Sequence, residues 1–216
     1  MEWMRGVLVV MVLTACGAGN AWAERVILFL GDSLTAGLGV EAEQAYPRLL
    51  GEMLARDGIS DVRIVNGGIS GSTSAGALAR LRWYQQIAPS ILFLALGAND
   101  GLRGLTMEEM ARNLNAVIEA AKARGMRVIL AGMELPPNYG QEYTAAFRHV
   151  YHDLAARHGL PLIPFLLEGV GGVPALNQAD GIHPNAEGHQ RIARHVYPTL
   201  KACVKTAGER PEAGKP

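Results

Sequence analysis

The chain is poor in cysteine, so disulfide bonds are not expected to stabilise its fold. Its 216 residues include two cysteines, Cys16 and Cys203. Cys16 lies in an N-terminal segment that we expect to be removed or lipidated, which leaves Cys203 without an intramolecular partner. Folding must therefore depend on a hydrophobic core. A chain of this length with 49% hydrophobic residues can form such a core in one domain.

Neither sign of charge is in excess. Lys and Arg number 20, as do Asp and Glu, which gives a formal net charge of zero. No basic surplus is available to attract a phosphate backbone, so a nucleic acid is not expected as a partner. Aromatic residues are also scarce, at 6%. This composition supplies little material for stacking against sugar rings.

The sequence also lacks an apolar run long enough to span a bilayer as a helix. The apolar run at residues 6–15 follows Arg5 and is too short for that purpose. A short basic segment followed by such a run is typical of a secretory signal peptide, here over residues 1–23. An uncleaved N-terminal helix is the alternative interpretation. The segment predicts an exported protein.

Two processing sites compete within this segment. Ala21-Trp22-Ala23 fits the small-x-small pattern cut by the ordinary signal peptidase, which would leave Glu24 as the first residue. Leu13-Thr14-Ala15-Cys16-Gly17 instead resembles a bacterial lipobox, which would place a lipid on Cys16. The protein is thus expected in the periplasm or the medium, or as a lipoprotein anchored to the membrane through Cys16 alone.

The rest of the chain alternates between short apolar runs and helical patterns, which predicts a parallel sheet covered by helices on both faces. The predicted strands are Arg25–Leu30, Val62–Val65, Ile91–Leu96, Val128–Leu130 and Leu160–Pro164. The predicted helices are Ala45–Arg56, Ala75–Gln86, Met107–Arg124, Gln141–His158 and Asn185–Lys201. Residues 24–205 would form one domain, followed by a polar, disordered tail at residues 206–216.

Four polar, glycine-containing motifs come where this fold would gather them. Three directly follow predicted strands: Gly31-Asp32-Ser33-Leu34, Asn66-Gly67-Gly68-Ile69-Ser70-Gly71 and Gly97-Ala98-Asn99-Asp100. The fourth, Asp180-Gly181-Ile182-His183, precedes the last predicted helix. Ligands of open α/β sheets bind outside the carboxyl ends of the strands. The four motifs are therefore predicted to share one site.

The residue types at this site match the needs of ester cleavage. Ser33 can serve as the nucleophile, His183 as its general base, and Asp180 as the group that orients the imidazole. Donors for the oxyanion could come from the backbone N–H groups of Ser33 and Gly71 and from the side-chain amide of Asn99. The predicted catalytic triad is thus Ser33, Asp180 and His183.

These four motifs resemble the sequence blocks of the SGNH (GDSL) hydrolase superfamily, and the resemblance covers nearly all of residues 24–203. It is strongest to the subgroup of periplasmic acyl-CoA thioesterases, lysophospholipases and arylesterases. Three stretches point to that subgroup: Gly97-Ala98-Asn99-Asp100-Gly101-Leu102-Arg103-Gly104-Leu105, Leu135-Pro136-Pro137-Asn138-Tyr139-Gly140 and Asp180-Gly181-Ile182-His183-Pro184-Asn185. A lone GDSL tetrapeptide is weak evidence, whereas four blocks in order are strong.

The resemblance implies a flavodoxin-like three-layer α/β/α sandwich and an enzyme without a metal requirement that cleaves acyl esters or thioesters, including lysolipids. The protein is also expected to need no cofactor and to be a monomer. It also implies a shallow acyl groove between the loops 101–106 and 133–140. The predicted substrate-binding residues there are Leu34, Leu102, Arg103, Leu135, Pro136 and Tyr139. Arg103 could meet a phosphate head group or be a plain surface charge. Residues 169–174 are richer in glycine than in relatives, which leaves the preferred chain length open.

Three other functions compete with this one. A carbohydrate acetylesterase on the same scaffold is the main alternative, although the low aromatic content disfavours sugars. A binding protein would be expected to lack a triad residue, and none is missing. An α/β-hydrolase lipase would carry a Gly-x-Ser-x-Gly elbow, which the chain does not contain. A metal site at His149 and His152 is disfavoured because no His-Glu-x-x-His pattern accompanies them.

Overall fold

A computed structural model describes residues 24–208 of the chain. The predicted signal peptide, with its alternative processing sites after Ala23 and at Cys16, lies outside the described residues, as do residues 209–216 of the predicted tail. The strands are β1 (Arg25–Gly31), β2 (Val62–Asn66), β3 (Ile91–Ala95), β4 (Arg127–Ala131) and β5 (Leu162–Ile163).

The strands form one parallel sheet in the order β2-β1-β3-β4-β5. Strand β3 is buried along its whole length, and β1 is buried from Val26 onward. Such continuous burial explains why these segments are uniformly apolar rather than alternating. In the middle of the sheet, Phe29 of β1 pairs with Phe93 of β3, and their rings stack with centroids 4.8 Å apart. The predicted five-stranded parallel sheet is confirmed.

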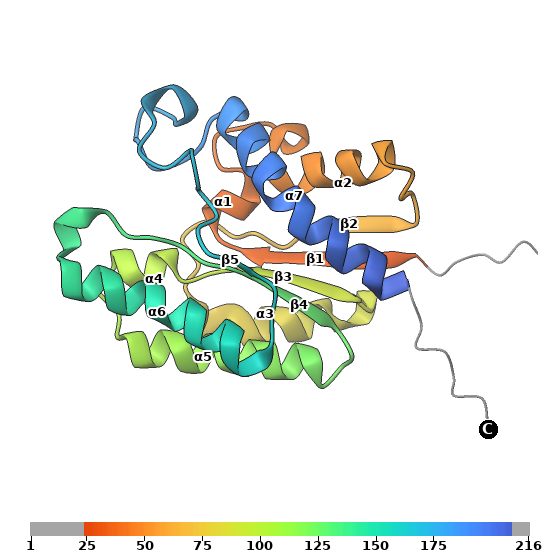
Figure 1. Ribbon diagram of the computed structural model, residues 1–216, viewed down its shortest axis with the longest axis horizontal. Helices are drawn as coiled ribbons and strands as arrows, with labels where there is room; N and C mark the ends of the chain where they lie inside the picture. Colours follow the sequence, from red (N-terminus) through yellow and green to blue (C-terminus); the bar gives the residue numbers. More distant parts are fainter. Residues whose placement is uncertain (1–23, 209–216) are drawn as a thin grey trace, which may run out of the picture.

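Helices cover both faces of the sheet (Figure 1). One layer contains α1 (Ser33–Ala36), α2 (Tyr46–Arg56) and α7 (Ala186–Gly208), and the other contains α3 (Ala77–Trp83), α5 (Met107–Lys122) and α6 (Gln141–His158). The short helix α4 (Ala98–Leu102) follows β3. Single 3₁₀ turns are η1 (Ala42–Gln44), η2 (Ser74–Gly76), η3 (Tyr84–Ile87), η4 (Pro137–Tyr139) and η5 (Pro174–Leu176). The predicted flavodoxin-like three-layer α/β/α sandwich is confirmed.

Two predicted elements differ from the observed ones in the middle of the chain. The helix predicted over Ala75–Gln86 is α-helical only in α3, with the 3₁₀ turns η2 and η3 on either side. The strand predicted over Leu160–Pro164 shrinks to the two residues of β5. Pro161 and Pro164 flank β5, and proline cannot donate a ladder hydrogen bond, which accounts for the shortening.

The last helix is longer than predicted, and this corrects the predicted start of the tail. Helix α7 continues from Lys201 to Gly208, so residues 206–208 are helical rather than disordered. Val204 is fully buried in this extension, and its carbonyl accepts a hydrogen bond of 2.6 Å from Arg25 Nη1. Arg127 Nη2 also donates to the Thr206 carbonyl at 2.8 Å. These contacts with distant residues explain why the helix continues past Lys201, the end predicted from the sequence, into the polar segment predicted to be disordered.

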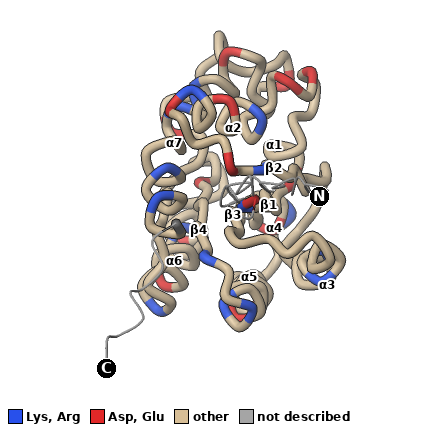
Figure 2. Tube along the Cα trace, turned by 90° about the vertical axis from the view of Figure 1, so that its right-hand side faces the viewer, with Lys and Arg blue, Asp and Glu red and all other residues tan. Residues whose placement is uncertain are grey.

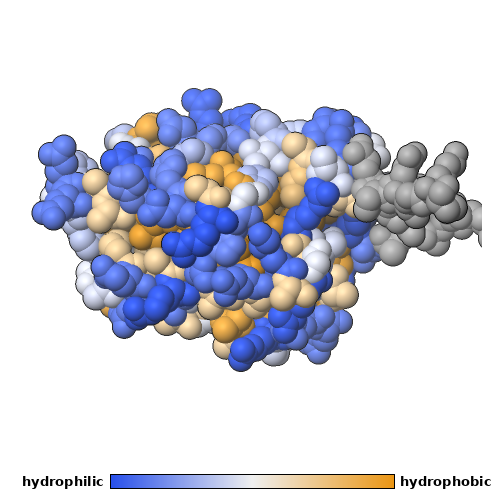
Figure 3. Space-filling model, turned by 60° about the horizontal axis from the view of Figure 1, so that its bottom comes forward, coloured by the Kyte–Doolittle hydropathy of each residue, from blue (hydrophilic) through white to orange (hydrophobic). Residues whose placement is uncertain are grey.

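The surface of the described residues is mixed in charge and polarity. Figure 2 shows Lys and Arg interspersed with Asp and Glu along the helices. On the face that carries α3, α5 and α6, polar residues surround smaller apolar patches (Figure 3). Among residues 24–208, no helix combines the length and the apolar character needed to cross a membrane.

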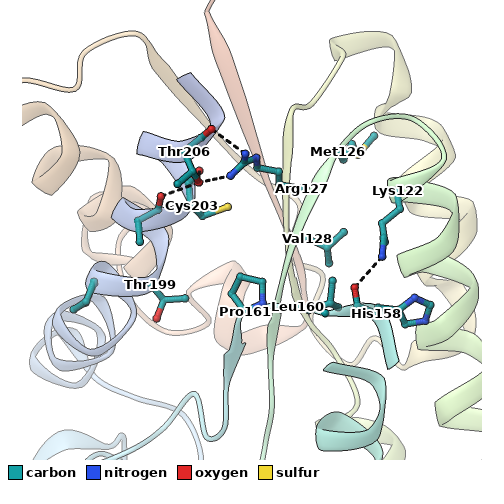
Figure 4. Close-up of a pocket in the computed structure, with 13 residues that line it drawn as sticks. Lys122, Met126, Arg127, Val128, His158, Leu160, Pro161, Thr199, Cys203 and Thr206 are labelled. Carbon is teal, nitrogen blue, oxygen red and sulfur yellow. Dashed lines mark hydrogen bonds between the residues drawn. The ribbon is translucent and has the colours of Figure 1, made fainter. Parts of the chain in front are cut away.

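A cavity of about 740 Å³ opens near the amino ends of β4 and β5 (Figure 4). Its walls include Val128, Leu160 and Cys203, with Lys122 and Arg127 beside them. Ser33 follows the carboxyl end of β1, so this cavity lies at the opposite end of the sheet from the predicted catalytic site. The fold therefore separates the cavity from the motifs that carry the predicted chemistry.

Candidate active site

Ser33 lies at the point where β1 turns sharply into α1. Asp32 is the N-cap of α1, and its Oδ1 accepts a hydrogen bond of 3.0 Å from the N–H of Leu34. Gly31 is required before it, because a Cβ at this position would overlap the side chain of Thr35. The turn leaves Ser33 half-exposed at the carboxyl edge of the sheet.

The structure brings the three predicted triad residues into one chain of hydrogen bonds. His183 Nε2 lies 2.9 Å from Ser33 Oγ, across 150 positions of sequence. On the other side of the ring, His183 Nδ1 lies 2.7 Å from Asp180 Oδ2. A hydroxyl, an imidazole and a carboxylate in this order can pass a proton from the serine to the histidine.

Asp180 is held by the turn that it orients. Its Oδ1 accepts the backbone N–H of Ile182 at 2.9 Å and that of His183 at 3.0 Å. These hydrogen bonds, led by the one from the His183 N–H, lower the Asp180 pKa from 3.8 to about 2. The Asp180 carboxylate is therefore ionised throughout the pH range in which a histidine can act as a general base.

The predicted oxyanion donors lie around Ser33. Gly71 adopts a φ of 75°, a left-handed conformation that favours glycine. Within residues 24–208, the N–H groups of Ser33 and Gly71 donate no hydrogen bond to the protein. Unpaired N–H groups beside a nucleophile are what an oxyanion hole requires.

Asn99, the third predicted donor, lies in α4, and its amide is turned toward the loop that follows β2 and carries Gly71. Its Nδ2 donates to the Ser72 carbonyl at 3.1 Å, which uses one of its two hydrogens. A second contact, to Asp32 Oδ2, is long at 3.4 Å. A developing oxyanion would form a shorter, charge-assisted bond and could replace that contact.

Two buried groups near the site are not part of the triad. Burial raises the pKa of Asp32 from 3.8 to about 6, although the Leu34 N–H and the charges of His183 and Arg80 oppose the shift. His189 is buried against Tyr46, whose N–H it accepts at 3.3 Å through Nδ1. Burial lowers the His189 pKa from 6.5 to about 4, so this imidazole is neutral at physiological pH.

The predicted substrate-binding residues divide into exposed and buried groups. Leu102, Arg103, Pro136 and Tyr139 are exposed, whereas Leu34 and Leu135 are only 5% and 8% exposed and pack in the core. Tyr139 Oη donates to the Leu102 carbonyl at 3.2 Å, so the two predicted groove loops touch. In this conformation Leu34 and Leu135 are therefore core residues and are not accessible to a substrate.

Asp100 is a buried carboxylate that holds the loop after β2, through a partner that the sequence does not indicate. Asp100 Oδ2 accepts the Ser74 N–H at 2.9 Å, and Asp100 Oδ1 accepts the Ser74 hydroxyl. Asn113 Nδ2 donates to the same hydroxyl at 3.1 Å. Asp100 follows Asn99 directly, yet its partner is 26 positions away, and no local pattern indicates a contact of that kind.

No group of three or more His, Cys, Asp or Glu side chains with metal-binding geometry occurs among residues 24–208. His158 Nε2 instead lies 2.7 Å from Asn115 Oδ1, and His195 Nε2 lies 3.0 Å from the Phe165 carbonyl.

A parallel three-layer sandwich with Ser, His and Asp at its carboxyl edge defines a serine hydrolase of the SGNH fold. The profile of the GDSL-like Lipase/Acylhydrolase family matches residues 29–191, and the chain belongs to that family. The resemblance inferred from the four motifs is confirmed.

Two bacterial enzymes and a solved structure are similar to this protein over most of its length. Esterase TesA of Pseudomonas aeruginosa is 43% identical over 202 residues, covering 93% of this chain and 98% of that protein. Thioesterase 1/protease 1/lysophospholipase L1 of Escherichia coli K12 is 38% identical over 186 residues, covering 86% and 88%. A crystal structure of TesA has a TM-score of 0.80 at 44% identity, over 83% of this chain and 99% of that one.

Proposed function

We propose that the protein hydrolyses acyl esters and thioesters, lysolipids among them, with Ser33 as nucleophile, His183 as general base and Asp180 as the group that orients the imidazole. The N–H groups of Ser33 and Gly71 and the amide of Asn99 would bind the oxyanion. The observation that carries this proposal is the hydrogen-bonded chain Ser33–His183–Asp180, 2.9 Å and 2.7 Å at its two links. The named relatives support the substrate class.

The reaction follows from this geometry in two steps. Ser33 Oγ attacks the acyl carbonyl carbon while its proton passes to His183 Nε2, and the oxyanion hole stabilises the charge on the carbonyl oxygen. The tetrahedral intermediate then expels the alcohol or thiol, which takes the proton from His183. Water attacks the acyl-Ser33 intermediate in the same way while His183 accepts its proton. The bond from the acyl carbon to Ser33 Oγ then breaks, Ser33 Oγ takes the proton from His183, and the acid is released.

The decisive experiment is a hydrolysis panel with the Ser33→Ala variant as control. The panel sets p-nitrophenyl esters of increasing chain length beside acyl-CoA, lysophospholipid and acetylated xylan. We expect cleavage of acyl esters and thioesters that Ser33→Ala abolishes, with the melting temperature unchanged. Turnover by Ser33→Ala equal to that of the wild type would refute the proposed nucleophile.

The same panel separates the competing functions. Activity confined to acetyl groups on xylan would indicate a carbohydrate acetylesterase instead. Absence of all Ser33-dependent turnover would indicate a binding protein on this scaffold.

We further propose that the protein is exported and monomeric. Export is supported by the apolar segment before Glu24, and cleavage after Ala23 and lipidation of Cys16 remain the two routes. Mass spectrometry of the purified protein distinguishes a chain beginning at Glu24 from one beginning at a lipidated Cys16. An uncleaved chain in the cytoplasm would contradict export, and a dimer in sedimentation would contradict the monomer.

A further inference from the structure

Three side chains from one turn of α4 and its C-cap hold the loop that carries Gly71. Asn99 Nδ2 donates to the Ser72 carbonyl at 3.1 Å, and Asp100 Oδ2 accepts the Ser74 N–H at 2.9 Å. Arg103 Nη2 donates to the Gly71 carbonyl at 2.8 Å. The loop that follows β2 is thus tied to the helix that follows β3, at the edge of the sheet where Ser33 lies.

Arg103 contacts both of the oxyanion donors that are not part of the Ser33 turn. Besides its bond to the Gly71 carbonyl, its Nη2 lies 3.5 Å from Asn99 Oδ1, one helical turn away. A contact of that length is weak as a hydrogen bond, but a cation still attracts the amide oxygen and repels the NH₂ group. The guanidinium thereby keeps Oδ1 outward and Nδ2 turned toward Ser72 and the site.

Gly71 depends on this contact because its own surroundings are open. It is exposed, it adopts a φ of 75°, and a Cβ placed on it would meet only Arg103 Nη2, at 3.3 Å. Glycine in such a loop has more conformational freedom than any other residue. Holding the Gly71 carbonyl restricts that freedom and so restricts where the Gly71 N–H points.

We propose that Arg103 is a positioning residue of the oxyanion hole, one that fixes the Gly71 loop and the Asn99 amide and places a positive charge behind both. The inference rests on the proposed function, since the oxyanion roles of Gly71 and Asn99 belong to it. It differs from the two roles that the sequence indicates for Arg103, contact with a phosphate head group and a plain surface charge. Arg103 forms no ion pair with a described carboxylate, so its charge is available for this role.

The test uses a substrate without a head group, so that binding and positioning give different results. We expect Arg103→Met to lower kcat on p-nitrophenyl butyrate by about 10- to 50-fold with KM changed less than about twofold, below the 10²–10³ typical of deleting a whole donor. Arg112→Met removes another exposed arginine, one in α5 that pairs with Glu109 at 3.8 Å, and should leave kcat unchanged.

Non-additivity provides the signature that a merely structural role would not show. Asn99→Ala alone should lower kcat by about 10²–10³, and Arg103→Met added to it should cost at least threefold less than it does in the wild type. Arg103→Lys, which keeps the charge but not the planar fork, should retain part of the rate and serves as a second variant.

Several outcomes would overturn the inference. Unchanged kcat on the butyrate ester would do so, as would a loss confined to KM for lysophospholipid, which would assign Arg103 to a head group. Equal losses in the wild type and in Asn99→Ala would show that Arg103 acts independently of the amide. Failure of the proposed function is seen separately, because turnover by Ser33→Ala would refute it whatever Arg103 does.

Discussion

The buried carboxylate of Asp32 provides a quantitative test of the electrostatics beneath the nucleophile. Asp32 is 2% exposed, and burial raises its pKa from 3.8 to about 6. Asp32→Asn removes the charge but keeps an oxygen that can accept the Leu34 N–H, so the cap of α1 survives. The substitution therefore isolates the cost of an ionised group in this position.

The sign and size of the effect follow from linkage. Because the folded pKa is above the unfolded value of about 3.9, the folded state holds this proton more tightly than the unfolded state. Stability from this group is complete below pH ~4 and is lost as pH rises through about 6. The loss is about 3 kcal/mol, at ~1.4 kcal/mol for each tenfold change in proton affinity. Asp32→Asn should thus be more stable than the wild type at neutral pH by up to that amount.

Urea unfolding of both proteins between pH 4 and pH 8 measures this difference. Groups that do not interact with Asp32 titrate alike in the two proteins and cancel, so the difference in unfolding free energy should rise between pH ~4 and ~6 and then level off. A difference that stays constant with pH would refute the reasoning, because it would show that Asp32 is not titrating in this range.

Two further substitutions test the triad and the close packing beneath it. Asp180→Asn keeps an oxygen for the backbone N–H groups but turns an NH₂ toward His183 Nδ1, which disfavours the imidazole orientation that a general base needs. We expect kcat on p-nitrophenyl butyrate to fall by about 10²–10⁴, and a loss below tenfold would contradict the orienting role. Gly68→Ala would place a Cβ 2.2 Å from the Ala36 backbone nitrogen, which should cost about 1–3 kcal/mol in urea unfolding. Gly76→Ala has open space and is the matched control, so an equal loss there would refute the packing argument.

Most of the fold could be predicted because its signals are local. The capping residue Thr106 accepts the Glu109 N–H at 3.3 Å, and α5 begins at Met107 as the pattern predicts. Helix α6 has the predicted bounds Gln141–His158 and ends at Gly159, whose φ of 63° suits a helix stop. Strand assignments also held wherever a run is buried on both faces.

The parts that could not be predicted depend on contacts between distant residues. Helix α7 extends to Gly208 because Val204 is buried and bonded to Arg25, a partner 179 positions away. At the site, the rule that ligands bind at the carboxyl edge of the sheet correctly predicts that the four motifs lie close together. It could not show that Asp100 holds Ser74 or that Arg103 holds the Gly71 carbonyl, because side-chain direction in a loop is set by the neighbours it meets.

The compact turn between Asp180 and His183 holds two of the three triad residues in one short segment. The turn is closed by an antiparallel bridge between Asn177 and Pro184 and by the Gln178 N–H, which donates to the His183 carbonyl at 2.8 Å. The carboxylate of Asp180 and the imidazole of His183 therefore form one local unit that is held together without Ser33. A displacement of this turn from β1 would change the distance from His183 Nε2 to Ser33 Oγ and leave the contact between Asp180 and His183 intact. A pair of spectroscopic labels, one on the turn and one near Ser33, could therefore follow assembly of the triad.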